Sequence, residues 1–289
     1  MSGKAEAISH GAATIVNAIA LGKGAAFGVD LWTKAEVRLT DESKVIKGEI
    51  TTDPAESTVL MEKTVLRVLG HFGVENIYGA EVKTTSNIPI ARGLKSSSSA
   101  ANAVALATVA ALTKTLDDPT IVNLGVEASF DAKVTVTGAF DDACASYFGG
   151  AVVTDNLKRK ILKRVEMPED LAVLFHVPPT KAYTRDSDLN RMETIKPLVE
   201  IVHNEALKGN FWPALTLNGL IYSSVLGYDT SVAADALAAG ALASGLCGKG
   251  PAVTAVVSNE NVDSVKTAFQ RYEGVVIQSQ LNREKAKVL

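Results

Sequence analysis

A glycine, a lysine and four consecutive serines stand directly before a long Ala-rich segment, in the stretch P-I-A-R-G-L-K-S-S-S-S-A-A (89–101). Proline and glycine interrupt regular structure here, and the Ala-rich run that follows is expected to be helical. The first amides of a helix lack intrahelical acceptors, glycine permits close backbone approach, and the helix dipole favours negative charge. The stretch therefore predicts a phosphate-binding loop, in which serine hydroxyls add donors and a serine oxygen reaches Mg²⁺.

A simpler interpretation of this loop is that a serine caps the helix, but one serine would satisfy that need. The chain contains no G-x-x-x-x-G-K-[ST] sequence, so the loop is not a Walker A motif. Gly22, Gly24 and Gly28 also miss the G-x-G-x-x-G spacing of dinucleotide-binding folds. The residues expected to bind the nucleotide are Pro89, Ile90, Ala91, Arg92, Gly93, Leu94, Lys95, Ser96, Ser97, Ser98 and Ser99, with Ser98 as the expected metal ligand.

Two adjacent carboxylates, Asp141 and Asp142, lie in the stretch T-G-A-F-D-D-A-C-A-S (137–146). A carboxylate beside an acceptor hydroxyl can orient that hydroxyl and take its proton. On a helix the two side chains diverge by about 100°, so only one of them can face a given hydroxyl. The spacing of the two aspartates also fits a second interpretation. In it, both acids lie at the amino terminus of a helix, where the helix dipole favours negative charge, and have no catalytic role.

A second glycine-rich stretch, G-L-C-G-K-G-P-A (245–252), has the backbone freedom to approach a ligand, and Lys249 can offset phosphate charge. The alternative for this stretch is a helix-to-strand turn that requires glycine. Arg185, in T-R-D-S-D (184–188), is a candidate for a bidentate contact with a carboxylate on the acceptor. A surface ion pair with a neighbouring aspartate explains this arginine equally well.

The three stretches together resemble the motifs of the GHMP kinases. The first resembles the nucleotide loop P-x-x-x-G-L-x-S-S-A with one additional serine, D-A-C-A-S-Y-F-G-G (142–150) resembles the segment that carries a catalytic aspartate, and 245–253 resembles the carboxy-terminal glycine-rich motif. They occur in the expected order over nearly the whole chain. Within the superfamily the chain is most similar to the archaeal-type shikimate kinases, through the lengthened serine run and through segments 17–31, 129–146 and 217–229.

The resemblance implies an α+β, two-domain GHMP kinase fold, with a ribosomal protein S5-like amino-terminal domain and a ferredoxin-like carboxy-terminal domain. It implies ATP and Mg²⁺ as requirements and the 3-hydroxyl of shikimate as acceptor, a step of chorismate and aromatic amino-acid biosynthesis. It selects Asp142 as the catalytic base and leaves Asp141 as a neighbour that raises its proton affinity. The residues expected to bind the acceptor are Asn17, Lys23, Arg185, Gly248, Lys249 and Gly250.

One position departs from the mevalonate-type relatives, which carry a lysine in an A-P-G-K-like stretch near the amino terminus. This chain has H-G-A-A-T-I-V-N (10–17) there, with Ala12 at the corresponding place. Lys23 and Lys133 are the candidates for the missing cation, and otherwise the aspartate acts without one. Each lysine is also explained as a solvated surface residue.

Two other functions fit the same motifs. The acceptor can be homoserine or an alcohol of the mevalonate pathway, because nucleotide-binding motifs carry little information about the alcohol. A catalytically inactive nucleotide-binding protein would keep the phosphate loop and lose turnover, although Asp142 argues against that function. Assays with each acceptor separate these alternatives.

The elements that must position these residues alternate between helices and strands, which is typical of α+β layers. Gly22, Gly24 and Gly28 indicate turns between strands within 11–40. A change of character near residue 155 predicts two domains, 1–155 for ATP binding and 156–289. Helices are expected over 59–69, 100–116, 124–133, 192–208, 211–225 and 262–272, and strands over 80–85, 151–154, 159–165, 171–177, 253–257 and 275–278.

Composition limits the remaining function classes. A net charge of -3 over 289 residues argues against electrostatic capture of nucleic acid. Cys144 and Cys247 show neither disulfide nor zinc-site spacing. Residues 1–10 lack the pattern of a signal peptide, and the apolar runs elsewhere are short or interrupted, so a cytoplasmic enzyme without membrane contact is expected. The expected partners are ATP and a small-molecule acceptor, and the oligomeric state stays open.

Overall fold

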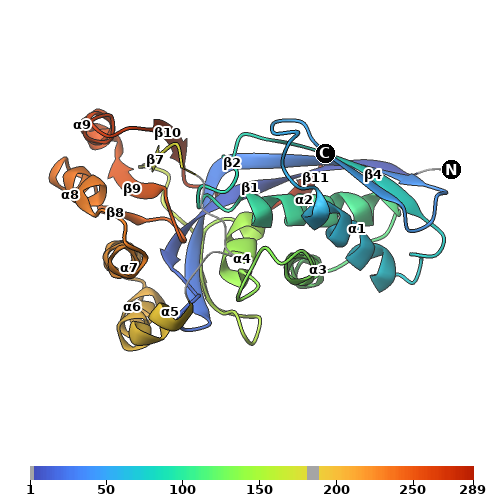
Figure 1. Cartoon of the computed structure of the whole chain (residues 1–289), viewed down its shortest axis with the longest axis horizontal. Coiled ribbons are helices and arrows are strands. Elements are labelled where there is room, and N and C mark those ends of the chain that lie inside the picture. The colour runs from blue at the N-terminus through green and yellow to red at the C-terminus, as the bar shows by residue number, and fades with distance from the viewer. Residues whose placement is uncertain (1–2, 181–188) are drawn as a thin grey trace.

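The computed structural model describes residues 3–180 and 189–289. Within these residues, a seven-stranded sheet occupies one end of the molecule and a four-stranded sheet the other (Figure 1). The larger sheet has the order β11-β1-β2-β4-β3, and β5 pairs with both β2 and β6. Its strands are β1 (Lys4–Val16), β2 (Lys23–Thr40), β3 (Ile46–Ile50), β4 (Gly79–Ser86), β5 (Ala151–Asp155), β6 (Lys160–Val165) and β11 (Lys287–Val288).

Strand β2 runs through most of the amino-terminal part and pairs with β1, β4 and β5. Gly22 makes the expected turn, with φ of 71°, but the two following glycines lie inside β2. They are glycines because other atoms pass close to the strand. A Cβ at Gly24 would lie 2.2 Å from the Asp141 carboxylate, and one at Gly28 would lie 3.1 Å from the Ala145 carbonyl oxygen. Both contacts come from the helix that carries the aspartate pair.

Four helices accompany the larger sheet, and α2 lies at their centre (Figure 1). Alanine predominates along α2, and its small side chains let β1, β2 and three helices approach it closely. Helix α3 begins six residues before its expected start, because Asp117 caps it by accepting the Thr120 amide and Pro119 occupies its first turn. The four helices are α1 (Val59–His71), α2 (Ser96–Ala111), α3 (Asp118–Asp131) and α4 (Phe140–Phe148).

The smaller sheet is antiparallel throughout, in the order β10-β7-β9-β8. Strand β8 includes Gly245 and Leu246, the first two residues of the glycine-rich stretch 245–252 for which the sequence favours a loop. The strands are β7 (Leu171–Val177), β8 (Ala243–Leu246), β9 (Val253–Ser258) and β10 (Val275–Gln280). The helices beside them are α5 (Leu189–Thr194), α6 (Lys196–Lys208), α7 (Phe211–Leu226), α8 (Ser231–Ala238) and α9 (Val262–Phe269), and a 3₁₀ turn, η2, spans Asn259–Asn261.

One apolar core joins the two ends of the molecule. It contains Phe27 and Val153 from the larger sheet and Phe175 and Leu215 from the carboxy-terminal part, all nearly or fully buried. The predicted boundary between residues 155 and 156 falls inside the β5–β6 hairpin, and β6 still pairs with the first sheet. The division into domains at that position stays a prediction.

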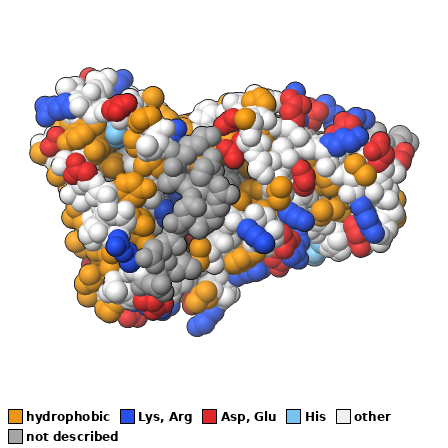
Figure 2. All heavy atoms as spheres, in the orientation of Figure 1, with side chains coloured by type: hydrophobic (Ala, Val, Ile, Leu, Met, Phe, Trp, Pro, Cys, Tyr) orange, Lys and Arg blue, Asp and Glu red, His pale blue; other side chains and the backbone are white. Residues whose placement is uncertain are grey.

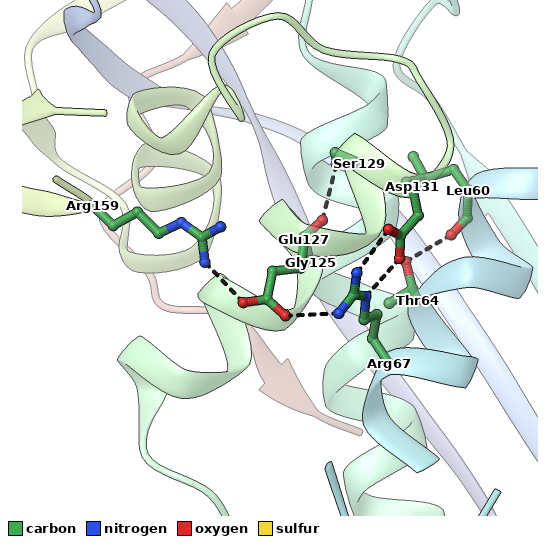
Figure 3. Close-up of polar contacts among 8 residues, drawn as sticks. All are labelled: Leu60, Thr64, Arg67, Gly125, Glu127, Ser129, Asp131 and Arg159. Carbon is green, nitrogen blue, oxygen red and sulfur yellow. Dashed lines mark hydrogen bonds and ion pairs between the residues drawn. The ribbon is translucent and has the colours of Figure 1, made fainter. Parts of the chain in front are cut away.

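A cluster of charged side chains holds α3 against α1 and the β5–β6 turn (Figure 3). The Arg67 guanidinium donates to both carboxylate oxygens of Asp131, at 2.5 and 2.7 Å, and to Glu127 at 3.3 Å. Arg159 donates to the other oxygen of Glu127 at 3.0 Å. These groups are about one-third exposed, so each pair stabilises the fold only modestly.

The surface has no single dominant charge on the face drawn in Figure 2, where acidic and basic side chains are interspersed over both parts of the molecule. Among residues 3–180 and 189–289, no helix is both long and apolar enough to cross a membrane.

Candidate active site

The phosphate-binding loop predicted from the sequence leads directly into α2. Its last residue, Lys95, has a left-handed backbone with φ of 65°, and α2 begins at Ser96. The Ser99 amide donates to the Lys95 carbonyl oxygen, so the amides of the preceding helical residues lack acceptors within the helix. These amides lie at the positive end of the helix dipole, which favours bound anions.

The second glycine-rich stretch packs against this loop. The Cys247 thiol donates to the Gly93 carbonyl oxygen at 3.1 Å, and the Ala252 amide donates to the Arg92 carbonyl oxygen at 3.3 Å. Gly93 has φ of 90°, and a Cβ there would lie 2.4 Å from the Cys247 carbonyl oxygen. Glycine is therefore required for both its backbone conformation and the close approach.

A cavity of about 160 Å³ lies between the two loops. Four separate segments supply its walls, so the fold brings together stretches that are far apart in the sequence. The lining residues are Asn17, Ala18, Ile19, Ala91, Gly93, Lys95, Ser96, Ser97, Ser98, Val134, Thr135, Val136, Thr137, Ala139, Asp141, Asp142, Gly248, Lys249 and Gly250.

Asp142 and Lys95 form a buried ion pair in this cavity. Their side chains are only 10% and 13% exposed, and Lys95 Nζ lies 2.9 Å from Asp142 Oδ2. Burial lowers the pKa of Lys95, but the surrounding negative charges, that of Asp142 foremost, together raise it above its ordinary value, so the amine stays protonated. The other carboxylate oxygen, Asp142 Oδ1, is buried and has no hydrogen-bond partner among the described residues. This oxygen is therefore an unsatisfied acceptor on a residue that lines the cavity.

Lys95 is the cation that contacts Asp142, whereas the sequence interpretation offered Lys23 and Lys133 for that place. Lys133 is exposed and does not line the cavity, and Lys23 lies at the start of β2. Gly248 makes the contact possible, because a Cβ at that position would lie 2.8 Å from Lys95 Nζ. The pair joins the phosphate loop to the helix that carries the aspartates.

Asp141 points to a different set of partners, as the helical divergence of the two aspartates requires. Its Oδ1 accepts a hydrogen bond from Asn156 Nδ2 at 2.7 Å, and Asn156 Oδ1 accepts from the Thr154 hydroxyl at 2.6 Å. Burial and the adjacent charge of Asp142 raise the pKa of Asp141 to about 7. Asp141 is therefore a buried acid that keeps its proton to a higher pH than an ordinary aspartate does.

This raised pKa predicts a pH-dependent stability difference for Asp141→Asn. The pKa of the carboxyl group in the unfolded chain is near its ordinary value of 3.8, whereas the folded one keeps its proton up to about pH 7. The folded state thus binds the additional proton between about pH 4 and 7, and wild-type stability falls as pH rises through that window. Relative to wild type, the asparagine variant should become progressively more stable until about pH 7, as denaturant unfolding at several pH values would measure. A stability difference that does not change with pH would contradict this assignment.

The carboxy-terminal loop is held in place by β1 and the residues that follow it. The Gly248 amide donates to the Thr14 hydroxyl at 3.0 Å, and the Gly248 carbonyl oxygen accepts from Asn17 Nδ2 at 2.8 Å. The Asn17 backbone is held in turn, since its amide donates to Asn218 Oδ1 and its carbonyl oxygen accepts from the Tyr222 hydroxyl. Asn17 therefore positions the loop in addition to lining the cavity.

The other residues expected from the sequence occupy several environments. Ser96, Ser97 and the expected metal ligand Ser98 line the cavity together with Ala91, Gly93 and Lys95. Ser99 is fully buried, and its hydroxyl donates to the Ser9 carbonyl oxygen at 3.1 Å. Leu94 belongs to the apolar core. Pro89, Ile90 and Arg92 are not among the lining residues, and Arg185 lies outside the described residues.

Three features of the cavity have no counterpart in the sequence interpretation. These are the contact between Lys95 and Asp142, the support of Asp141 by Asn156, and the wall formed by residues 134–137. Residues 95 and 142 are far apart in the sequence, so no motif spacing indicates their contact. The alternation of valine and threonine in 134–137 matches no known motif. Only the three-dimensional fold reveals them.

The site fits a nucleotide accompanied by Mg²⁺. No cluster of three metal-ligating side chains occurs in the described parts of the chain. Mg²⁺ that accompanies a nucleotide takes most of its ligands from phosphate oxygens and water, with one or two from the protein. The free amides of α2 and the Ser98 hydroxyl at the cavity wall suit the phosphates and that ion.

Comparisons with known proteins give the family and the fold of the chain. The family described as "GHMP kinases N terminal domain" matches residues 60–150. A protein named shikimate kinase from Methanosarcina mazei is 45% identical over 288 residues, which cover 99% of this chain and 97% of the relative. A shikimate kinase from Methanosarcina acetivorans is 46% identical over 288 residues, 99% and 97% of the two chains. The crystal structure of homoserine kinase from Cytophaga hutchinsonii superposes with a TM-score of 0.73 at 19% identity, covering 100% of this chain and 98% of the other.

Proposed function

Since the chain belongs to the shikimate kinase family within the GHMP kinases, we propose that its cavity transfers the γ-phosphoryl group of ATP to the 3-hydroxyl of shikimate. The observation that carries this proposal is the arrangement of Asp142. One of its oxygens contacts Lys95, the other is buried and has no partner in the part of the chain that the structure describes, and Asp142 lines the cavity together with residues of the phosphate loop. The predicted fold and family are confirmed, and the roles of individual residues are our proposal.

Asp142 Oδ1 orients the acceptor hydroxyl and takes its proton. When bound, ATP with Mg²⁺ supplies the phosphoryl group that the acceptor oxygen attacks, and ADP leaves. The transition state spreads negative charge over the transferred group, so the protein's main contributions are alignment and charge neutralisation. Amides at the start of α2 and the hydroxyls of Ser96, Ser97 and Ser98 are placed for the phosphate oxygens.

Lys95 serves both sides of the reaction. Its ammonium holds the Asp142 carboxylate in position before the reaction, and its place at the end of the phosphate loop puts a positive charge where the transferred group passes. Asp141 is a positioning residue in this scheme. Because its pKa is raised to about 7, it carries less negative charge near neutral pH than an ordinary aspartate would, in a site that must accept anionic ligands.

The direct test is to incubate the purified protein with shikimate, Mg²⁺ and γ-labelled ATP and to measure shikimate 3-phosphate. Homoserine and mevalonate, tested in parallel, distinguish a kinase with another acceptor. Preferential labelling of either would reject shikimate as the substrate. Nucleotide binding without transfer to any of the three would instead favour a non-catalytic nucleotide-binding protein.

A cytoplasmic location is part of the proposal. Both cysteines are buried free thiols, which supports a reducing compartment. ATP is available there in quantity. Fractionation of the source cells, followed by immunodetection, would test this location.

A further inference from the structure

Residues 134–137 form a wall of the cavity that the reaction scheme does not use. Their sequence, V-T-V-T, alternates apolar and hydroxyl side chains. Thr135 and Thr137 are half-buried, whereas Val134 and Val136 are 36% and 38% exposed. A wall of this composition matches a ligand that carries hydroxyl groups on an apolar ring.

The segment is held firmly at both ends. On one side, Arg67 fixes Asp131 at the end of α3 (Figure 3), and the Val134 amide donates to the Ser129 carbonyl oxygen. On the other side, Gly138 has φ of 81°, and a Cβ there would lie 2.8 Å from the Val126 side chain. The wall is therefore anchored to α3.

Two non-glycine residues flanking this wall have left-handed backbones. Lys133 has φ of 56° and Ala139 has φ of 48°. This conformation costs free energy for residues with a Cβ, and such strain concentrates at functional sites. The cost is consistent with a segment whose shape serves ligand binding.

Both threonine hydroxyls are available to a ligand. Thr137 Oγ1 accepts a long hydrogen bond, 3.5 Å, from Asn156 Nδ2, and its own hydrogen remains free to be donated. Thr135 has no hydrogen-bond partner for its hydroxyl among the described residues. Asn156 Nδ2 also donates to Asp141, so Asn156 links Thr137 to the aspartate pair. Thr135 precedes Thr137 by two residues and lacks this link.

We propose that Thr135 and Thr137 recognise the two non-reacting hydroxyls of the acceptor, while Val134 and Val136 cover the apolar part of its ring. This inference rests on the proposed function, since Asp142 must face the reacting hydroxyl. Thr137 then faces the neighbouring 4-hydroxyl of shikimate, and Thr135 faces the 5-hydroxyl. Residues 134–137 thereby determine acceptor specificity.

Replacing Thr135 by valine tests this inference, because valine keeps the shape and removes the hydroxyl. We expect KM for shikimate to rise roughly tenfold, with KM for ATP unchanged, from the loss of one hydrogen bond. Thr135→Ser, which keeps a hydroxyl, should restore most of the affinity. Thermal unfolding of the variants would show that the fold is intact.

A substrate analogue completes the test. With 5-deoxyshikimate, the wild-type enzyme should already show the raised KM. Thr135→Val should raise it no further, because the analogue lacks the hydroxyl that Thr135 would bind. An unchanged KM for shikimate in Thr135→Val, or an equal additional loss with the analogue, would overturn the inference. Neither result touches the proposed function, which fails only if the unaltered protein makes no shikimate 3-phosphate.

Discussion

Replacing Asp142 by asparagine is expected to lower kcat about 10²-fold or more, while ATP binding is retained. Asparagine has nearly the same shape but cannot take the acceptor's proton, and the unpartnered Oδ1 is the atom we assign to that task. Steady-state kinetics with shikimate measures the loss, and calorimetric titration with a non-hydrolysable ATP analogue measures nucleotide affinity. A kcat within a few-fold of wild type would remove Asp142 from the role of base.

The variant also leaves Lys95 without its charged partner, so stability must be measured beside the rate. Breaking a buried pair by neutralising one member costs about 3–5 kcal/mol in typical cases. Here Asp141 can compensate, because the charge of Asp142 is one of the causes that raise its pKa. Without that charge, Asp141 ionises more readily and offsets the ammonium of Lys95.

A matched control is available in Asp155, which is also buried but does not line the cavity. Its carboxylate accepts the Lys158 amide in the β5–β6 turn. Asp155→Asn should affect stability and leave kcat near its wild-type value. An equal fall in kcat for both variants would indicate that general weakening of the fold, not loss of the base, explains the result.

Sequence motifs predicted the fold, the family and the stretches that meet at the cavity, because each motif is a local requirement. Residue 93 must be glycine because its φ is positive and the Cys247 carbonyl oxygen lies close to it. Serines before an Ala-rich helix indicate an anion site. The family and the α+β GHMP fold are confirmed by the comparisons.

The partners of individual side chains could not be predicted in the same way. Lys95 looks like a phosphate ligand in the sequence, but in the structure its amine contacts Asp142, and the absence of a Cβ at Gly248 leaves room for it. Asn17 looks like a ligand-binding residue, yet its side-chain amide donates to the Gly248 carbonyl oxygen. Both contacts depend on how the carboxy-terminal loop packs on the first sheet, which local sequence patterns do not encode.

Replacing Lys95 by methionine is expected to lower kcat by about 10²- to 10³-fold and to weaken ATP binding as well. Methionine keeps much of the aliphatic length but removes the charge that faces both Asp142 and the phosphate loop. Kinetics and nucleotide titration measure the two effects separately. Lys160→Met, on an exposed lysine outside the cavity, is the matched control and should lose little activity.

The double variant Lys95→Met with Asp142→Asn decides whether the two residues act as a unit. If they do, the double variant should lose little more rate than either single one, since each single change already disables the pair. Its stability should also exceed that of Lys95→Met, because no uncompensated buried charge from the pair remains. Fully additive losses in kcat, or a Lys95→Met enzyme that loses only ATP affinity, would show that Lys95 is a phosphate ligand alone. In that case the contact with Asp142, although buried and only 2.9 Å long, would not contribute to phosphoryl transfer.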